Sequence, residues 1–495
     1  MNTDSIKATV WDQFRQRDLR AFQHIFSPRR LALAAARCGL AVGHSPLNLA
    51  NLLWLALACA WHRSRSFADV LGLFLKTLGD AQDWLHDPLR PLCQPDPDGR
   101  PARRSKHDPR GGPPGTPSEE AFAQARPKLP PRLVDCLLLL LWDDFERAYP
   151  DYVRYKGLRL LALDGTTVRL EHWQALAEHF GCQGNGGRGR PCPSARLVMV
   201  NSPLTRLPWR YELTPLADHE RAVATRLLDR LRRDDLVLMD KGFFSYGLFW
   251  HIHAQGAFFA LRLKAGVNLQ TLRSLGPADR LVRWRPVDWR KAWKDLPRSL
   301  DLRVIDYQIK GFRPSAVLTN LLDDRHVSAA EWVRLATVDE AGRVLEPGLY
   351  HRRWEIETTF LELKVTQGLE GSLRSRSPAG VQFEVAGHVL LYLGVRWLLA
   401  EAAAGAGLAD PLRLSFQAAR VELEDLWPQL RTAGERHVVE VLLPRLRQRL
   451  ASHRVPLRPG RHFPRPGHPA SKDKGRKRRK NKSNAKKPNT KKTAA

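Results

Sequence analysis

The stretch Asp235–Asp240 reads DLVLMD, a short apolar run that ends in an aspartate. A second stretch of the same kind, RLLALD, spans Arg159–Asp164. Continuous apolar runs of this length are typical of central strands that are covered on both faces of a sheet. Because parallel strands bring their carboxyl ends to one edge, the sequence predicts that Asp164 and Asp240 lie there together.

The segments around these two stretches alternate between strand and helix patterns. We expect helices at 218–233 and 244–255, and strands at 159–164, 195–201, 208–216, 235–240 and 257–263. Three strands, a helix and a further strand follow the element order of a ribonuclease H-like core. The expected fold class is therefore α/β, in the mixed α+β sense.

A core of this kind needs a closing helix soon after its fifth strand, yet the next suitable helix begins near Pro347. The intervening residues 267–346 show strand-like alternation at 302–309 and 316–321, which predicts a β-rich insertion. We therefore place the first part of the core at 132–266, and the closing helix with the helix that follows it at 347–404.

The remaining segments differ in composition. Residues 1–94 are helical in pattern and are expected to form an N-terminal DNA-binding domain, and 405–465 to form a helical C-terminal region. Residues 95–131 are rich in Pro, Gly, Arg and Lys, as in a mobile basic linker. The segment 466–495 is predicted to be a disordered basic tail, since the last 25 residues hold 12 Lys or Arg against one Asp.

The net charge of +29 and the pI near 10.4 indicate a polyanionic partner, either nucleic acid or an anionic membrane. The most apolar stretch, Leu47 to Trp61, is shorter than the roughly 20 residues of a spanning helix. We therefore expect DNA as the partner and no membrane. The N-terminus has no signal-like apolar region and the chain has only six cysteines, so a cytoplasmic location is expected.

A third candidate acid lies on the predicted closing helix. At about 100° per residue, Tyr350, Arg353, Glu357 and Lys364 fall within roughly 60° of one another. The neighbouring Glu355 and Glu362 point to the other side, and Leu361 is interpreted as packing beneath the stripe.

The three acids Asp164, Asp240 and Glu357 form one predicted constellation. Three carboxylates are sufficient to hold two Mg²⁺ or Mn²⁺ ions, which prefer hard oxygen ligands and take further oxygens from a substrate phosphate. Two such ions activate a water or hydroxyl and stabilise the leaving oxygen in phosphodiester cleavage. The sequence therefore predicts catalytic metal ligands at these three positions.

The pattern Tyr350-x2-Arg353-x3-Glu357-x6-Lys364 resembles the YREK signature of cut-and-paste insertion-sequence transposases of the DDE type. Asp164-Gly165-Thr166 and Asp240-Lys241-Gly242-Phe243 resemble the surroundings of the two aspartates in that family. The resemblance covers about residues 159–400 and includes LRSRSP at 373–378.

The resemblance implies a prokaryotic, nucleoid-associated enzyme that nicks one strand at each transposon end and passes through a hairpin. The freed end then joins to target DNA, and a homodimer holds the paired double-stranded ends. Tyr350, Arg353 and Lys364 would grip the DNA backbone, with Arg374 and Arg376 as further contacts. A tryptophan of the insertion would stack near a flipped base; Trp289 and Trp293 are the candidates we favour, and Trp284 and Trp332 are alternatives.

Three other interpretations stay open. One is a catalytically silent protein that occupies the same DNA ends as a repressor, and another is a metal-dependent nuclease without strand transfer. The third concerns His172, His179, Cys182 and Cys192, which suggest a zinc site although their spacing matches no common structural pattern.

Overall fold

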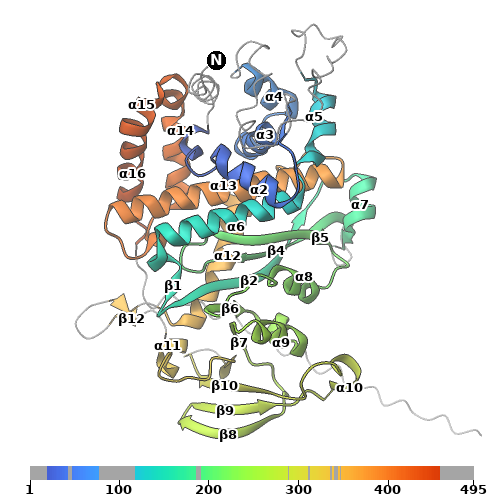
Figure 1. Cartoon of the computed structure of the whole chain (residues 1–495), viewed down its shortest axis with the longest axis vertical. Coiled ribbons are helices and arrows are strands. Elements are labelled where there is room, and N and C mark those ends of the chain that lie inside the picture. The colour runs from blue at the N-terminus through green and yellow to red at the C-terminus, as the bar shows by residue number, and fades with distance from the viewer. Residues whose placement is uncertain are drawn as a thin grey trace, which may run out of the picture.

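The computed structural model describes residues 19–42, 47–76, 117–184, 191–287, 289–309, 313–334, 337–338, 344–345 and 347–456. The predictions for the basic tail, for the start of the N-terminal region and for most of the linker concern residues outside these ranges. In Figure 1 the helices from the two ends of the chain gather at one end of the molecule, and the strands β8 to β10 lie at the other.

A mixed sheet lies at the centre of the molecule (Figure 1). The parallel strands are β2 (Leu158–Arg169), β6 (Asp235–Met239) and β7 (Phe258–Arg262). On the other side of β2, β4 (Cys192–Asn201) and then β5 (Pro208–Pro215) continue the sheet by antiparallel pairing. These five strands therefore lie side by side in the order β5–β4–β2–β6–β7.

Burial explains why the strands read as apolar runs. All residues of β6 are buried, and so is the first half of β2, from Leu158 to Leu163. β2 does not end at Asp164 as predicted but continues to Arg169, because β4 pairs with it along residues 162–169. The parallel pairing of β2 with β6, in contrast, ends at Leu163 and Met239.

The segment predicted to be a β-rich insertion contains strands that extend the same sheet. β11 (Ser315–Thr319) pairs antiparallel with β7, and β10 (Leu300–Tyr307), β9 (Asp279–Trp284) and β8 (Leu269–Gly276) follow in that order. The strands predicted at 302–309 and 316–321 are therefore present as β10 and β11. The small pieces of this segment are α10 (Trp289–Ala292), α11 (Ala329–Val333), β12 (Thr337–Val338) and β13 (Val344–Leu345).

Helices pack on the strands of the core. α6 (Pro131–Ala148) contacts β5, α8 (Glu220–Leu227) contacts β4 and β5, α9 (Tyr246–Ala254) contacts β7, and α12 (Trp354–Leu361) contacts β2. Short elements complete this part: β1 (Arg154–Tyr155), α7 (Gln174–Phe180), β3 (Cys182–Gln183), η5 (Pro150–Tyr152) and η6 (Lys241–Phe243).

The two ends of the chain share one hydrophobic core with the sheet, which extends from Leu19 to Leu450. The N-terminal helical elements are η1 (Arg20–Phe22), α2 (Pro28–Arg37), α3 (Leu49–Trp61) and α4 (Phe67–Lys76). The C-terminal elements are α13 (Pro378–Gly405), η9 (Pro411–Arg413), α14 (Phe416–Thr432), α15 (Glu435–His437), η10 (Val438–Leu442) and α16 (Leu443–Ser452).

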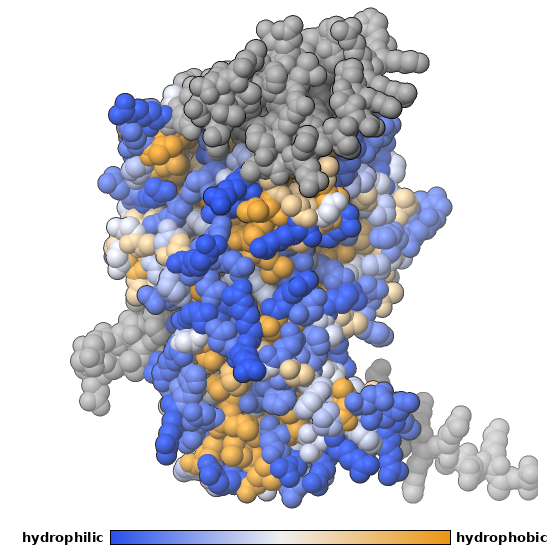
Figure 2. Space-filling view, viewed as in Figure 1, coloured by the Kyte–Doolittle hydropathy of each residue, from blue (hydrophilic) through white to orange (hydrophobic). Residues whose placement is uncertain are grey.

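The helix α13 is the centre of this helical end. Within the described ranges it is the one helix long and apolar enough to cross a membrane, and its most apolar window is completely buried. Gly387 of α13 lies against α3 so closely that an added Cβ would lie 2.1 Å from the backbone oxygen of Ala56. Hydrophilic residues cover most of the face shown in Figure 2. Burial thus identifies α13 as a core helix.

The end of the predicted linker is folded. α5 (Glu119–Ala125) and the 3₁₀ turn η4 (Arg126–Lys128) lie inside the predicted linker range of 95–131. Phe122 of α5 is buried, and its ring contacts the rings of Phe67 in α4 and Phe383 in α13. Apolar contacts thus order residues that composition alone assigned to a mobile segment.

Candidate active site

Two strands of the sheet place Asp164 and Asp240 at its centre. Leu163 of β2 and Met239 of β6 are the last residues that pair between these parallel strands, and each acid is the residue that follows. The prediction that the two strands deliver their acids to one place is therefore met by the register of the sheet. The backbone N–H of Gly165 donates a hydrogen bond to Oδ1 of Asp164 at 2.9 Å, which fixes that carboxylate.

The helical segment that carries Glu357 is less regular than predicted. It begins as a 3₁₀ helix, η7 (Leu349–Arg353), continues as α12 and ends as a π-helical turn, η8 (Glu362–Thr366). Leu361 is 57% exposed, so the interpretation that it packs beneath the stripe is wrong. The constant angle of 100° per residue, on which that interpretation depended, does not hold along this segment.

The choice of Glu357 among the three glutamates agrees with the contacts of its neighbours. Glu355 and Glu362 both form ion pairs with Arg206, and Glu362 also pairs with the buried Arg396. These two carboxylates therefore belong to an internal network on another side of the helix.

Arg353 connects Glu357 to the aspartates. Its Nη2 donates a hydrogen bond to Oε1 of Glu357 at 2.9 Å, and its Nη1 lies 3.9 Å from Oδ2 of Asp164. The side chain of Arg353 is only 5% exposed. A predicted DNA-binding residue is thus buried among the predicted metal ligands.

A further cation, Arg262 of β7, was not identified from the sequence. Its Nη2 donates a hydrogen bond to Oδ1 of Asp240 at 3.2 Å. Although burial acts to raise the pKa of Asp240, the charges of Arg353 and Arg262 prevail and lower the pKa of this carboxyl. Asp240 is therefore a carboxylate at neutral pH.

Asp164 shows the opposite shift. Burial raises the pKa of Asp164 to about 6, and the hydrogen bond from Gly165 and the charge of Arg353 oppose this only in part. The carboxylates of Glu220 and Glu357 add repulsion that raises the pKa further. Burial thus outweighs the hydrogen bond and the positive charge beside this carboxylate.

Glu220, in the first turn of α8, is a second site residue that the sequence analysis missed. A Cβ added to Gly165 would lie 1.9 Å from Oε1 of Glu220, so the carboxylate reaches the backbone beside Asp164. A glycine directly after Asp164 leaves room for this approach. In the sequence, the only signal is an acid at the start of the helix after β5.

Tyr350 and Lys364 flank the three acids. The hydroxyl of Tyr350 donates a hydrogen bond to the backbone oxygen of Met239 at 3.3 Å, and the residue is 4% exposed. Nζ of Lys364 donates a hydrogen bond to the backbone oxygen of Thr167 at 2.9 Å and lies 3.4 Å from Glu370. Both side chains thus connect the helical segment to β2 and β6.

The other predicted DNA contacts lie elsewhere. The indole N–H of Trp289 donates a hydrogen bond to the backbone oxygen of Leu296, and Trp293 packs against Gly247 and Tyr246. Arg374 is half-buried against Phe67 and pairs with the buried Glu384, whereas the exposed Arg376 lies over the ring of Trp173. None of these four has a contact with the three acids among the interactions of the described residues.

No group of three or more His, Cys, Asp or Glu side chains in the described ranges is arranged to hold a metal ion. These ranges include His172, His179, Cys182 and Cys192, so the zinc interpretation gains no support. They also include the three acids, of which Asp164 and Glu357 approach Arg353 and Asp240 pairs with Arg262. The chemistry of three carboxylates nevertheless suits Mg²⁺ or Mn²⁺.

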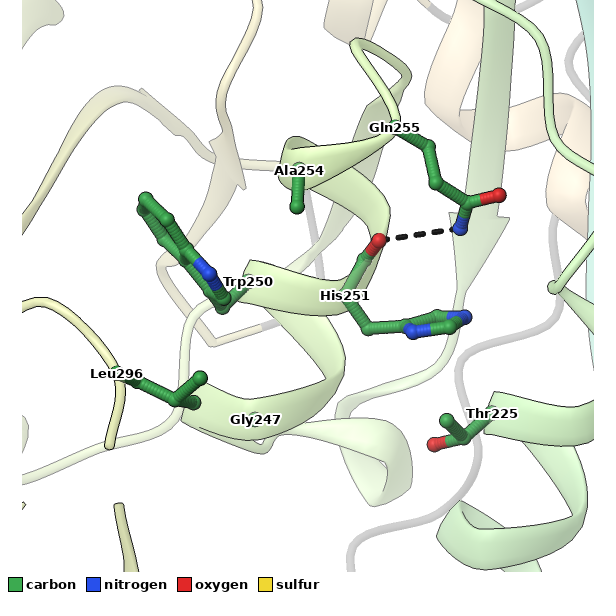
Figure 3. Close-up of a pocket in the computed structure, with 7 residues that line it drawn as sticks. All are labelled: Thr225, Gly247, Trp250, His251, Ala254, Gln255 and Leu296. Atoms are coloured by element: carbon green, nitrogen blue, oxygen red, sulfur yellow. Dashed lines mark hydrogen bonds between the residues drawn. The ribbon is translucent and has the colours of Figure 1, made fainter. Parts of the chain in front are cut away.

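A cavity of about 480 Å³ lies beside α9 (Figure 3). It is lined by Thr225, Gly247, Trp250, His251, Ala254, Gln255 and Leu296. None of the three acids lines it, so the cavity is distinct from the candidate site.

Known proteins to which this chain is similar include transposases. Residues 155–393 match the family model described as the transposase DDE domain, a span that contains all three acids. This part of the chain is therefore similar to DDE transposase domains.

A particular relative extends the similarity. The chain is 27% identical over 353 residues to the transposase InsG for insertion sequence element IS4 of Escherichia coli strain K12, which covers 70% of this chain and 75% of the relative. A solved structure of piggyBac transposase in a synaptic complex with hairpin DNA matches with a TM-score of 0.36 and 9% identity. That match covers 90% of this chain and 87% of the other.

Proposed function

We propose that the chain is the cut-and-paste transposase of an insertion sequence. It binds the terminal inverted repeats of its element, excises the element and joins its 3′ ends to target DNA. The transposase DDE domain and the similarity to the IS4 relative support this class of reaction. The observation that supports the proposal most is that Arg353 lies beside both Asp164 and Glu357, while its charge lowers the pKa of Asp240 at the end of β6.

A ribonuclease H-like core is part of the proposal. It is supported by the strand order β5–β4–β2–β6–β7, in which β2, β6 and β7 are parallel and β4 and β5 are antiparallel to their neighbours. The closing helix is α12, which packs on β2. The strands β8 to β11 are the insertion between β7 and this helix.

We assign Asp164, Asp240 and Glu357 as the ligands of two Mg²⁺ or Mn²⁺ ions. The fit is supported by their hard oxygen donors and by the fact that Asp164 and Glu357 already approach one positive charge, that of Arg353. Such ions supply an activated oxygen nucleophile and stabilise the leaving oxygen. The chain itself holds Asp164 through the N–H of Gly165 and keeps Asp240 ionised through Arg262 and Arg353.

The residues proposed to contact DNA differ in how exposed they are and in whether other groups of the protein already hold them. Arg376 is exposed, whereas Tyr350, Arg353 and Lys364 are engaged inside the protein and have to change partners to reach a phosphate. Trp289 and Trp293 are half-buried, so either presents only part of its ring to a base. We propose that the enzyme works at the prokaryotic nucleoid, where chromosomal DNA lies in the cytoplasm.

A homodimer on paired ends is the remaining part of the proposal. Most of α13 is buried, so we assign the contact between protomers to the helices that follow it. Val439 and Val441 of η10 are 57% and 45% exposed. The double substitution Val439→Asp and Val441→Asp should reduce complexes that hold two DNA ends while single-end binding persists. Unchanged two-end complexes would place the dimer contact elsewhere.

The decisive experiment is cleavage of a labelled duplex that carries the ends of the element, with Mg²⁺ present. We expect cleavage by the wild type and none by Glu357→Gln, with DNA binding retained in both. Glu355→Gln is the matched control, because it removes a carboxylate from the same helix that pairs with Arg206 instead. A denaturing gel also shows whether the excised ends are hairpins.

Two other outcomes correspond to the competing functions. Tight binding of the ends without cleavage by any variant, the wild type included, would indicate a silent repressor. Cleavage without strand transfer to a target duplex would indicate a metal-dependent nuclease.

A further inference from the structure

The surroundings of Arg353 are unusual for a residue expected to bind DNA. Its guanidinium donates a hydrogen bond to Glu357 at 2.9 Å and lies 3.9 Å from Asp164, and only 5% of the side chain is exposed. Its charge also lowers the pKa of Asp240, more than any other charge near that carboxyl. One guanidinium therefore serves all three acids of the candidate site.

The position of Arg353 has a cost that shows it is not a fully satisfied core residue. Its Nε is buried and has no hydrogen-bond partner among the described residues. A buried donor without an acceptor loses its hydration and gains nothing in exchange. The guanidinium thus gives up part of its hydrogen bonding to remain beside the acids.

The other two cations of the site are placed differently. Lys364 contacts the backbone oxygen of Thr167 and the carboxylate of Glu370, and Arg262 contacts Asp240 and is 39% exposed. Neither lies between two of the acids. Only Arg353, among the described cations, stands in the place where a bound ion would balance the carboxylates.

We propose that Arg353 is the built-in counter-ion of the acidic site and competes there with divalent ions. In the protein without DNA, the guanidinium neutralises Glu357 and Asp164 and weakens metal binding, because two cations so close together repel each other. A DNA phosphate supplies an alternative bidentate partner for the guanidinium. Arrival of DNA then frees the acids, so ion binding becomes coupled to DNA binding.

This inference rests on the proposed function and adds a regulatory role to it. It also reconciles the expected grip of Arg353 on the DNA backbone with its buried position. The two partners of Arg353 are used in sequence: carboxylates before DNA binds, and phosphate afterwards. The free energy of the coupling is limited by the difference between these two sets of contacts.

The test measures Mn²⁺ binding to the full chain without DNA, from the electron paramagnetic resonance signal of free Mn²⁺. We expect Arg353→Gln to bind Mn²⁺ about tenfold more tightly than the wild type, a coupling of the usual size. Lys364→Gln is the matched control, since it removes one positive charge from the same stripe and should change the affinity little. Arg353→Lys keeps the charge and should bind as weakly as the wild type.

Equal or weaker Mn²⁺ binding by Arg353→Gln would overturn the inference, because a residue that merely positions Glu357 gives that result. Circular dichroism in EDTA and in Mn²⁺ covers the case of a folding defect. A variant that is unfolded in EDTA but folded in Mn²⁺ supports the inference, since the acids then need some cation. A variant that is unfolded in both contradicts it.

The same titration separates this inference from the proposed function. If the wild type and all variants bind no Mn²⁺, with or without element-end DNA, the two-ion chemistry itself fails. If the wild type binds Mn²⁺ and cleaves DNA but Arg353→Gln binds no more tightly, only the counter-ion role fails.

Discussion

Replacement of Asp235 by asparagine should destabilise the protein strongly, because Asp235 is half of a buried ion pair. Its carboxylate accepts two hydrogen bonds from Arg159, at 2.5 and 2.6 Å, and both side chains are completely buried. The two residues form the first pair in the register of β2 with β6, four positions before Leu163 and Met239. It therefore supports the register that brings Asp164 next to Asp240.

The size of the effect follows from what remains around Arg159. After Asp235→Asn, its nearest carboxylate is that of Glu146, whose Oε2 lies 3.6 Å from Nη1. Burial raises the pKa of Asp235 even though Arg159 opposes this, which shows how strongly desolvation acts here. Breaking such a pair from one side costs about 3–5 kcal/mol. At roughly 2–4 °C per kcal/mol, the midpoint of thermal unfolding should fall by about 6–20 °C.

Differential scanning calorimetry at pH 7.5 measures this effect, and Asp301→Asn provides the matched control. Asp301 accepts a similar two-bond contact from Arg283, at 2.6 and 2.8 Å, but on the surface. We expect the control to melt close to the wild type, since exposed pairs contribute little. Equal shifts for the two variants, or a negligible shift for Asp235→Asn, would refute the reasoning from burial.

Three further outcomes are expected from unfolding measurements. Gly387→Ala should lower the free energy of unfolding by about 1–3 kcal/mol or more, because the added Cβ would lie 2.1 Å from a backbone oxygen of α3. Gly405→Ala, near the end of the same helix, is the control and should be tolerated, because its Cβ meets open space. Asp164 binds its proton more tightly in the folded state, at a pKa of about 6 against an ordinary 3.8, so its contribution to stability falls as pH rises between these values. In EDTA, the unfolding midpoint of Asp164→Asn minus that of the wild type should therefore grow from pH 4 to pH 6, and a constant difference would contradict this. Tyr350→Phe loses a 3.3 Å hydrogen bond to Met239 and should lower the free energy of unfolding by about 1 kcal/mol; a loss above about 3 kcal/mol would point to another role for the hydroxyl.

The positions of the two aspartates at the strand ends could be predicted from the sequence, because local patterns determine them. A buried parallel strand needs a continuous apolar run, and the acid that follows the run is visible without any knowledge of the fold. The predicted strands at 195–201, 208–216 and 257–263 correspond to β4, β5 and β7 within a few residues.

The contacts of Arg262 and Glu220 could not be predicted in this way. Arg262 reaches Asp240 because β7 lies next to β6, and Glu220 reaches Asp164 because Gly165 has no side chain. Both contacts depend on which strands are neighbours in space. The burial of Arg353 was also hidden, since its position on a polar stripe is equally compatible with solvent.

Leu361 was misplaced for a different reason. A helical wheel assumes one residue spacing, whereas the segment changes from 3₁₀ to α to π geometry within 18 residues, from Leu349 to Thr366. In the fold, α12 contacts β2 and η7 contacts β6, and no periodicity in the segment itself reveals these contacts or the change of helix type.

The contact between Gly387 and Ala56 has a consequence for shortened forms of this protein. Because α3 lies directly on α13, a chain that lacks the first 130 residues would present part of the long apolar helix α13 to water. Such a fragment would retain the three acids, yet it should aggregate or adhere to lipid through the uncovered surface. Any catalytic fragment therefore has to keep the N-terminal helices, however remote they are from the chemistry.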